Sequence, residues 1–141
     1  MARFYDEVFS KGNMAVADEI VDPTFDAIFT GEKNFAKASD GLEKLKEGIT
    51  GFRKSFPDYK IEVSDMVAEG DIVVAHIKGT GTYQGGMEDL GVPKSAISKK
   101  VIFHGTDYTR VVNGKMVEAW GTHDDLPWFQ QMDMKLVPAS E

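Results

Sequence analysis

The stretch that decides the fold is Val101–Met132, VIFHGTDYTRVVNGKMVEAWGTHDDLPWFQQM. Its pattern predicts a strand, a turn at Asn113-Gly114, a second strand, an acidic corner and a short amphipathic helix. An Asn-Gly pair between two such runs is the strongest short-range signal for a β-hairpin. Both tryptophans and two of the three histidines also lie here. We therefore expect this stretch to hold most of any reaction centre.

The length and composition predict one acidic domain over residues 1–141, with a net charge of −7. This charge disfavours nucleic acid and anionic membrane surfaces as partners. The absence of cysteine excludes disulfides, thiolate nucleophiles and cysteine-bound zinc, and the histidines lack metal-ligand spacing, so no metal or cofactor is expected. No apolar run approaches the roughly 20 residues of a membrane span, and no signal peptide is recognisable, so the cytoplasm is the expected compartment.

The order of elements predicts an α+β fold. Apolar spacing indicates helices first, and alternating runs indicate strands afterwards, with Thr24–Thr30 either a strand or an extended segment. Gly79 and Gly81 suggest a bend or bulge in a long strand. Residues 84–100 form a long loop, which is typical of a lid. The predicted helices are Phe4–Phe9, Met14–Val21 and Leu42–Phe56, and the predicted strands before the opening stretch are Tyr59–Val63 and Ile72–Tyr83.

Several short motifs in a fixed order resemble the SnoaL-like polyketide cyclase family of the NTF2-like superfamily. The resemblance runs from about residue 4 to residue 132. The motifs are Asp18-Glu19 before Asp22-Pro23, Phe56-Pro57-Asp58, Glu69-Gly70-Asp71 with Ile72-Val73-Val74, Gly81-Thr82, Arg110 before Asn113-Gly114 and Glu118, Trp120 before Asp124, and Gln130-Gln131.

The resemblance implies a cone, in which N-terminal helices wrap a curved antiparallel sheet around an apolar pocket, and a homodimer. It also implies cofactor-free aldol closure of a polyketide ester, with a carboxylate at Asp124 as general acid and base. This sequence departs from the family where Tyr83 and Pro93-Lys94-Ser95-Ala96 stand in the loop that would cover the cavity mouth. The substrate would therefore be selected at this loop.

The register of the hairpin decides which side chains share a face. A two-residue turn at Asn113-Gly114 pairs Val112 with Lys115 and separates Arg110 from Trp120 and Asp124. A three-residue turn with Gly114 as a bulge pairs Val111 with Lys115 instead. The second register gathers the titratable groups on one face, and we prefer it for that reason. The face then holds His104, Thr106, Tyr108, Arg110, Glu118, Trp120, Thr122 and Asp124.

Asp124 is the predicted general acid or base. Apolar surroundings raise the pKa of a carboxylate and suit it to proton abstraction beside a carbonyl. Trp120, Trp128 and Phe129 could supply those surroundings. The alternative is that Asp124 caps the following helix, but Asp125 competes for that position and the family resemblance favours catalysis.

Other polar residues are assigned supporting roles. His104 and Arg110 join Asp124 as catalytic candidates, by passing a proton or stabilising an enolate, although Arg110 and Glu118 could form only a cross-strand ion pair. For His76, a hydrogen-bonded residue in the wall of the pocket is a simpler interpretation than a catalytic residue. His123 has the opposite parity to Asp124 and is expected to point away from the pocket. The predicted substrate-binding residues are Tyr108, Trp120, His76, Tyr83, Glu118, Trp128 and Phe129.

The leading hypothesis is an acid/base enzyme that acts without a cofactor on a hydrophobic, carbonyl-bearing small molecule, most like a polyketide or ester cyclase. Rival enzymes on the same fold are an isomerase, a dehydratase or an epoxide hydrolase. A rival of another class is a non-catalytic dimeric protein that binds a small molecule.

Overall fold

The computed structural model describes residues 1–28 and 39–140. Among them, no helix is long and apolar enough to cross a membrane. The sequence prediction for Phe29 and Thr30 lies outside the described residues. The elements are η1 (Phe4–Ser10), α1 (Met14–Ile20), β1 (Val21–Ile28), β2 (Ser39–Asp40), α2 (Leu42–Ser55), β3 (Lys60–Glu69), β4 (Ile72–Thr82), η2 (Glu88–Leu90), η3 (Lys94–Ala96), β5 (Lys100–Val112), β6 (Lys115–His123) and α3 (Asp125–Gln130).

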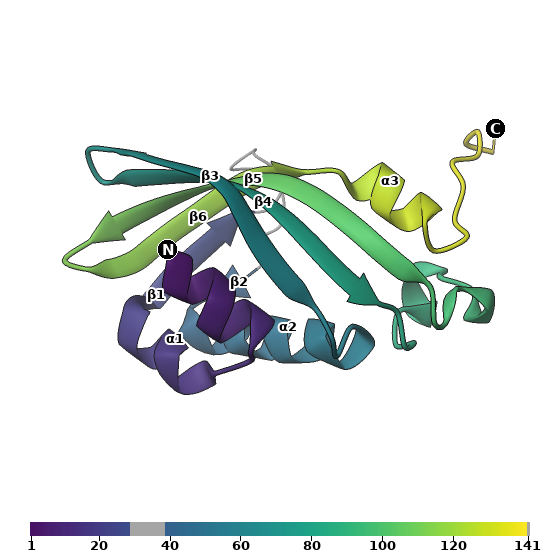
Figure 1. The fold of residues 1–141 in the computed structure, drawn as a ribbon, viewed down its shortest axis with the longest axis horizontal. Helices are drawn as coiled ribbons and strands as arrows, with labels where there is room; N and C mark the ends of the chain where they lie inside the picture. The colour runs from purple at the N-terminus through teal and green to yellow at the C-terminus, as the bar shows by residue number, and fades with distance from the viewer. Residues whose placement is uncertain (29–38, 141) are drawn as a thin grey trace.

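The strands form one sheet in the order β2-β1-β6-β5-β4-β3. Figure 1 shows η1, α1 and α2 on one side of the long strands and α3 beyond the end of β6, which confirms the predicted α+β architecture. The pairs from β3 to β6 are antiparallel, as predicted. In contrast, β1 pairs with β6 in parallel, so the sheet as a whole is mixed. Parallel neighbours need a long connection, and the chain between β1 and β6 includes α2 and the strands β3 to β5.

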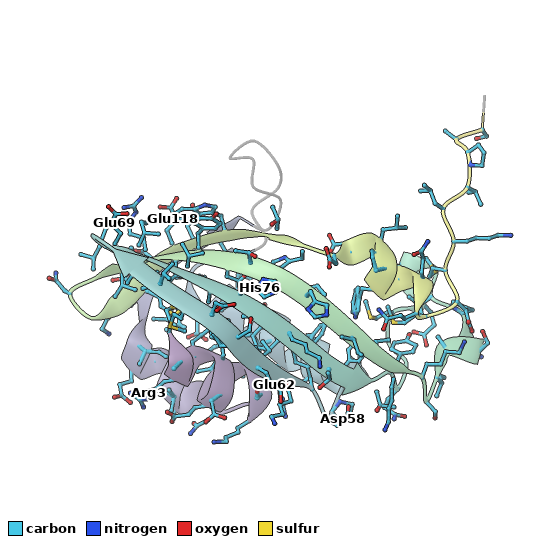
Figure 2. The ribbon with its side chains drawn as sticks, turned by 45° about the horizontal axis from the view of Figure 1, so that its top comes forward. Arg3, Asp58, Glu62, Glu69, His76 and Glu118 are labelled. Atoms are coloured by element: carbon cyan, nitrogen blue, oxygen red, sulfur yellow. The ribbon has the colours of Figure 1, made fainter. Side chains whose placement is uncertain are left out.

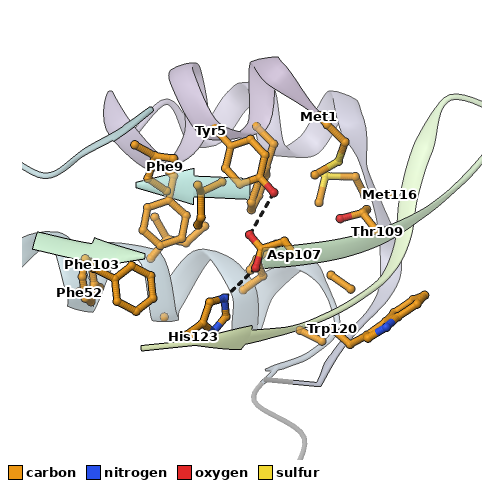
Figure 3. A pocket seen from close by; sticks show the side chains of 18 of the residues that line it. Met1, Tyr5, Phe9, Phe52, Phe103, Asp107, Thr109, Met116, Trp120 and His123 are labelled. Carbon is orange, nitrogen blue, oxygen red and sulfur yellow. Dashed lines mark hydrogen bonds and ion pairs between the residues drawn. The ribbon is translucent and has the colours of Figure 1, made fainter. Parts of the chain in front are cut away.

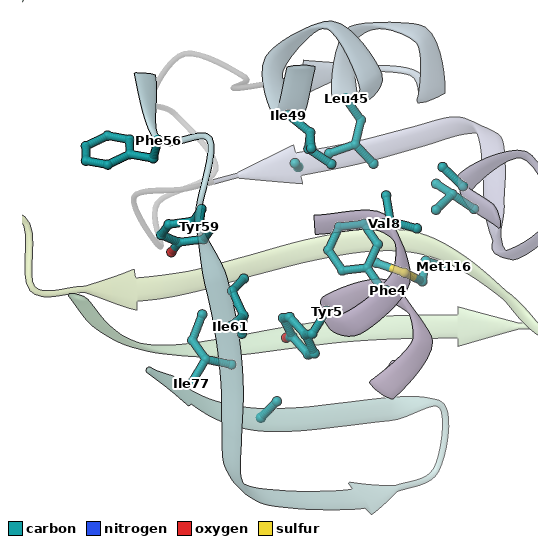
Figure 4. Packing of buried hydrophobic residues seen from close by; sticks show 14 of the residues in the cluster. Phe4, Tyr5, Val8, Leu45, Ile49, Phe56, Tyr59, Ile61, Ile77 and Met116 are labelled. Carbon is teal, nitrogen blue, oxygen red and sulfur yellow. The ribbon is translucent and has the colours of Figure 1, made fainter. Parts of the chain in front are cut away.

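The N-terminal helices pack through the apolar positions that predicted them. The π-helix η1 buries Phe4, Tyr5 and Val8, and α2 buries Leu42, Leu45 and Ile49 on one face. Pro57 disfavours helical geometry in the residue before it, so α2 ends at Ser55. Figure 4 shows these apolar side chains meeting between the helices and the sheet.

The β5–β6 hairpin has a two-residue turn, not the three-residue turn that the sequence favoured. Asn113 and Gly114 have φ values of 52° and 77°, and Val112 pairs with Lys115, so the turn contains two residues. The predicted three-residue turn is therefore wrong. A bulge follows between the pairs Val111–Met116 and Arg110–Glu118, where β6 has one additional residue, Val117. The bulge places Arg110 directly opposite Glu118, so the two side chains share a face as predicted, although the predicted register had them two rungs apart.

The two faces of the sheet are different environments. The odd-numbered residues of β5, including Val101 and Thr109, are buried toward the helices, while even-numbered residues such as Ile102 and His104 are exposed. The same alternation places Ala75 and Ile77 of β4 in the core. The inner face of β5 therefore carries the odd-numbered side chains.

Gly79 and Gly81 do not mark a bulge in β4. Pairing with β5 is continuous through both positions, Gly79 also pairs with Ile61 of β3, and the register shift on this side lies in β3 between Val63 and Asp65. A Cβ atom at Gly79 would lie 2.1 Å from the Tyr59 hydroxyl oxygen, and one at Gly81 would lie 3.1 Å from the Tyr59 ring. These glycines instead make room for a buried aromatic ring.

Two glycine substitutions should affect stability in opposite directions. Gly51→Ala in exposed α2 meets no atom within 4 Å, so we expect it to raise the free energy of unfolding by about 0.5–1 kcal/mol. Gly121→Ala in β6 would bring its Cβ within 2.5 Å of the Thr106 carbonyl oxygen, so we expect it to destabilise the fold. Urea unfolding measures the free energy of unfolding of both variants. A change of the same sign in both would contradict the prediction.

Candidate functional site

A cavity of about 420 Å³ lies between the inner face of the sheet and the N-terminal helices. Most of its lining is apolar: Met1, Phe4, Phe9, Phe25, Ala27, Leu45, Ile49, Phe52, Ile61, Ile77, Phe103, Met116, Ala119, Trp120 and Trp128. The polar and charged side chains of the lining are Tyr5, Lys44, Tyr59, Asp107, Thr109, His123 and Asp125. An apolar cavity with a few converging polar groups is the usual form of a small-molecule site.

Asp107 of β5 holds a hydrogen-bond network inside this cavity (Figure 3). The Tyr5 hydroxyl donates to its Oδ2 at 3.0 Å, and His123 Nε2 lies 2.7 Å from its Oδ1. The side chains of Asp107 and His123 are only 21% and 12% exposed. The network therefore joins η1, β5 and β6 through one carboxylate.

A glycine positions the imidazole of this network. Gly105 of β5 is the cross-strand partner of His123, and a Cβ atom there would lie 2.2 Å from His123 Cδ2. The missing side chain allows the imidazole ring to lie over the β5 backbone. Phe103, two residues earlier, packs on the same ring with centroids 5.2 Å apart. The local sequence Phe103–Asp107 thus provides the ring contact, the space and the carboxylate.

The cavity keeps two tyrosines in the protonated form. Burial, followed by the Asp107 charge and its hydrogen bond, raises the pKa of Tyr5. Burial and the same charge also raise the pKa of Tyr59. Both hydroxyls are therefore hydrogen-bond donors at neutral pH.

The cavity differs along its length. Figure 3 shows Phe9, Phe52 and Phe103 on one side of the Asp107 network, and Met1, Thr109 and Met116 on the other. The cavity therefore has aromatic rings on one side of the Asp107 network, and methionine and threonine side chains on the other.

A protein-family model for SnoaL-like polyketide cyclases matches residues 1–132. The chain belongs to the SnoaL-like polyketide cyclase family. This confirms the resemblance seen in the sequence motifs, and the solved structures described next confirm the NTF2-like fold.

Solved structures similar to this SnoaL-like protein carry different functional names. A candidate SnoaL-like polyketide cyclase from Jannaschia sp. CCS1 is 24% identical, with a TM-score of 0.80 over 96% of this chain and 90% of that one. A candidate polyketide cyclase from Bacillus cereus ATCC 10987 is 28% identical, with a TM-score of 0.72 over 93% and 76% of the two chains. An epoxide hydrolase from M. tuberculosis is 11% identical, with a TM-score of 0.68 over 93% and 84%. A search of curated proteins finds no match.

The predicted polar face of the hairpin is the outer face of the sheet, so its placement in the pocket wall is wrong. His104 and His76 stack on each other there, with centroids 6.2 Å apart, and neither lines the cavity. Figure 2 shows His76 and Glu118 on the side of the sheet away from the helices. Arg110 pairs with Asp71 at 2.8 Å and with Glu118 at 3.3 Å, which is the structural alternative considered for it. The reason is the strand alternation described above, which directs even-numbered residues of β5 outward.

The two aspartates at the acidic corner have exchanged their expected positions. Asp124 occupies the N-cap position of α3, although its exposed side chain makes no capping hydrogen bond, and it does not line the cavity. Asp125, expected to be the cap, is the aspartate that borders the cavity. The catalytic role of Asp124 stays a prediction.

The aromatic residues predicted to bind substrate differ in their positions relative to the cavity. Trp128 lines the cavity and is 91% buried, and Phe129 packs on it from outside the lining. Trp120 borders the cavity, but its ring stacks on Tyr108 at 5.7 Å on the outer face. Tyr83 is buried away from the cavity, where its hydroxyl accepts the Met87 N–H.

The loop 84–100 does not cover the cavity, because none of its residues is in the lining. It packs against the C-terminal segment instead, where Ser95 and Lys99 both bind the Asp133 carboxylate. The prediction that this loop selects the substrate is therefore not supported by its position.

Sequence reasoning missed Asp107, Tyr5 and Tyr59 and rejected His123. One signal was available, because Val101 and Phe103 mark the odd-numbered face of β5 as the apolar one, and Asp107 has the same parity. No local pattern connects Tyr5 to Asp107, which is 102 positions away in the chain.

The network predicts how stability depends on pH. At pH 7, Tyr5→Phe should lower the free energy of unfolding by about 1–3 kcal/mol, because it removes a hydrogen bond to a carboxylate. The pKa of Tyr5 is raised in the folded state, so the unfolded chain ionises first and stability falls as pH rises above about 10. Tyr5→Phe should make this alkaline loss smaller. Urea unfolding between pH 7 and pH 11 tests this, with exposed Tyr108→Phe as the control, and an unchanged pH dependence would refute it.

Proposed function

We propose that this SnoaL-like protein is an acid/base enzyme that moves a proton on a hydrophobic, carbonyl-bearing small molecule, most like a cyclase that closes a ring by an intramolecular aldol reaction. The observation that carries the proposal is Asp107, a carboxylate paired with Tyr5 and His123 inside an apolar cavity. Membership of the polyketide cyclase family supports the same class of substrate.

The chemistry requires a base, and later an acid, at the same place. Asp107 takes a proton from the carbon beside the substrate carbonyl and leaves an enolate. The enolate carbon then bonds to a second carbonyl carbon of the same molecule, and the resulting alkoxide recovers a proton from the Asp107–His123 pair. The sequence is redox-neutral, and the proton taken is returned.

The structure supplies two conditions for this reaction. A carboxylate has about four lone-pair positions, and the contacts from Tyr5 and His123 use one on each oxygen, which leaves capacity for a substrate proton. The aromatic and aliphatic walls hold a flexible substrate folded, which brings the two reacting carbons together.

Proton transfer at a carbonyl fits the cavity better than epoxide hydrolysis does. Opening of an epoxide by water would use a water molecule held between an aspartate and arginine, aspartate or asparagine partners. Among the described residues that line the cavity there is a second aspartate, Asp125, but no arginine or asparagine, and Arg110 is bound to Asp71 and Glu118 on the other face. An isomerase or dehydratase would use the same proton transfer and is separated from a cyclase by its product.

Exchange of hydrogen for deuterium tests the proton transfer without knowledge of the natural substrate. We expect the protein to accelerate exchange of the methyl protons of 2-acetylnaphthalene in D₂O, measured by NMR. Asp107→Asn should reduce this rate about 10²–10⁴-fold because the amide cannot take the proton. Asp65→Asn, an exposed change on the outer face, is the control for a carboxylate-to-amide substitution.

The same assay decides between the two aspartate assignments. If Asp107 is the base, Asp124→Asn keeps most of the exchange rate. Loss of exchange in Asp124→Asn with full exchange in Asp107→Asn would instead support the assignment made from the sequence. Binding of the ketone without exchange in any of these proteins would support the non-catalytic alternative.

We also propose that the protein is a homodimer, as the family resemblance implies, and that the two copies pair through the outer face of the sheet. Support comes from an apolar row across four strands, in which Val67, Val74, Tyr108 and Trp120 are successive cross-strand partners. Val67 is 66% exposed and Tyr108 is 37% exposed. Exposed apolar rows of this kind are typical of association surfaces.

Association through this row predicts a specific effect of charge. Val67→Lys should convert a dimer into a monomer, because it places an unpaired charge in the apolar contact. Leu136→Lys, which changes an equally exposed apolar residue outside the sheet, should leave the dimer intact. Sedimentation velocity measures both, and a monomeric parent protein or a dimeric Val67→Lys variant would contradict the proposal.

A further inference from the structure

Tyr59 is a cavity residue with a fixed ring. It directly precedes β3, is only 4% exposed and lines the cavity. Its ring packs edge-on against Phe52, with centroids 4.7 Å apart, and against Phe9 at 5.6 Å. Its backbone N–H donates to the Phe56 carbonyl at 3.0 Å, which secures the turn before β3. These contacts determine where the hydroxyl lies.

The hydroxyl of Tyr59 is different from those of the other buried tyrosines. The Tyr5 hydroxyl donates to Asp107, and the Tyr83 hydroxyl accepts from the Met87 N–H. Within residues 1–28 and 39–140, no hydrogen bond to the Tyr59 hydroxyl is formed. Because Tyr59 lines the cavity, its hydroxyl can bond to a molecule that enters it.

The surrounding strand is built to accommodate this hydroxyl. A side chain at Gly79 in the middle of β4 would begin 2.1 Å from the Tyr59 oxygen. Glycine within a strand weakens it, and here the missing side chain keeps the hydroxyl in place. The position of the hydroxyl is therefore specified by Tyr59, just before β3, and by Gly79 on the neighbouring strand β4.

The hydroxyl also lies within the electrostatic influence of the proposed base. The Asp107 charge adds to burial in raising the pKa of Tyr59, so this phenol keeps its proton and remains a donor. Tyr5 is already bound to Asp107, whereas Tyr59 can donate to another molecule. A base and an uncommitted donor then line the same cavity.

We propose that the Tyr59 hydroxyl donates a hydrogen bond to the carbonyl oxygen of the substrate. The assignment rests on the proposed function, because it names the group that receives the negative charge when Asp107 removes the proton. The charge develops on the carbonyl oxygen, and a prepositioned donor there stabilises the enolate.

A pair of ligands with the same shape isolates this hydrogen bond. The probes are 2-acetylnaphthalene and 2-isopropenylnaphthalene, in which a CH₂ group replaces the carbonyl oxygen. Their dissociation constants are measured by quenching of tryptophan fluorescence, since Trp120 and Trp128 both line the cavity. For each variant, the two dissociation constants are expressed as a ratio. The hydration of each free ligand is the same for every variant, so it cancels when these ratios are compared. Tyr59→Phe should weaken ketone binding relative to the hydrocarbon about 5–10-fold, the size of one hydrogen bond.

The control variants separate a specific contact from a general disturbance. Tyr83→Phe, which alters a buried tyrosine outside the cavity, should leave the ratio unchanged. Gly79→Ala, which displaces the Tyr59 hydroxyl, should change the ratio in the same direction as Tyr59→Phe. A ratio that stays within about twofold of the parent value in Tyr59→Phe would overturn the assignment.

The binding ratio does not depend on turnover. Measured in Asp107→Asn, a continued effect of Tyr59→Phe supports the Tyr59 contact even if Asp107 proves not to be the base. The opposite result is deuterium exchange that depends on Asp107 together with an unchanged binding ratio in Tyr59→Phe. That result refutes the Tyr59 assignment and leaves the proposed function standing.

Discussion

The hydrogen bonds of Asp107 are the interaction on which the rest of the site depends. A carboxylate within an apolar cavity is stable only when its oxygens are paired, and here the partners are Tyr5 from η1 and His123 from β6. The requirement fixes η1 against the inner face of the sheet and aligns β5 with β6 at this level. Burial and the Asp107 charge together raise the pKa of both cavity tyrosines, so the carboxylate also acts on its neighbours electrostatically.

Glycines in the strands make these positions possible. Gly105 leaves space for the His123 ring and Gly79 leaves space for the Tyr59 hydroxyl, each at a distance that no Cβ atom could share. Strand interiors usually avoid glycine because it packs poorly and is costly to order. Its presence opposite two polar cavity residues indicates that the shape of the inner face was selected around those side chains.

The fold was largely predictable from the sequence, and the site was not. Apolar spacing located the helices and strands because burial of one face produces that spacing directly. The direction of the hairpin faces was misjudged because clustered polar residues such as His104 and Arg110 were taken to mark a pocket, although polar clusters on a strand more simply mark solvent. Val101 and Phe103 identified the inner face, but the contact between Tyr5 and Asp107 arises only in the folded chain.

The position of the cavity changes where substrate selection should be sought. The loop 84–100 packs against the C-terminal segment, whereas η1 and α2 contribute Phe9, Leu45, Ile49 and Phe52 to the lining. The sheet contributes Asp107 and His123. The proposed proton-transfer residues lie on the sheet, whereas the apolar wall opposite them lies on the helices. Substitutions in the helices can therefore change the size of the ligand that fits without altering the proposed proton transfer. Variation among proteins of this fold is then expected in η1 and α2 more than in the sheet.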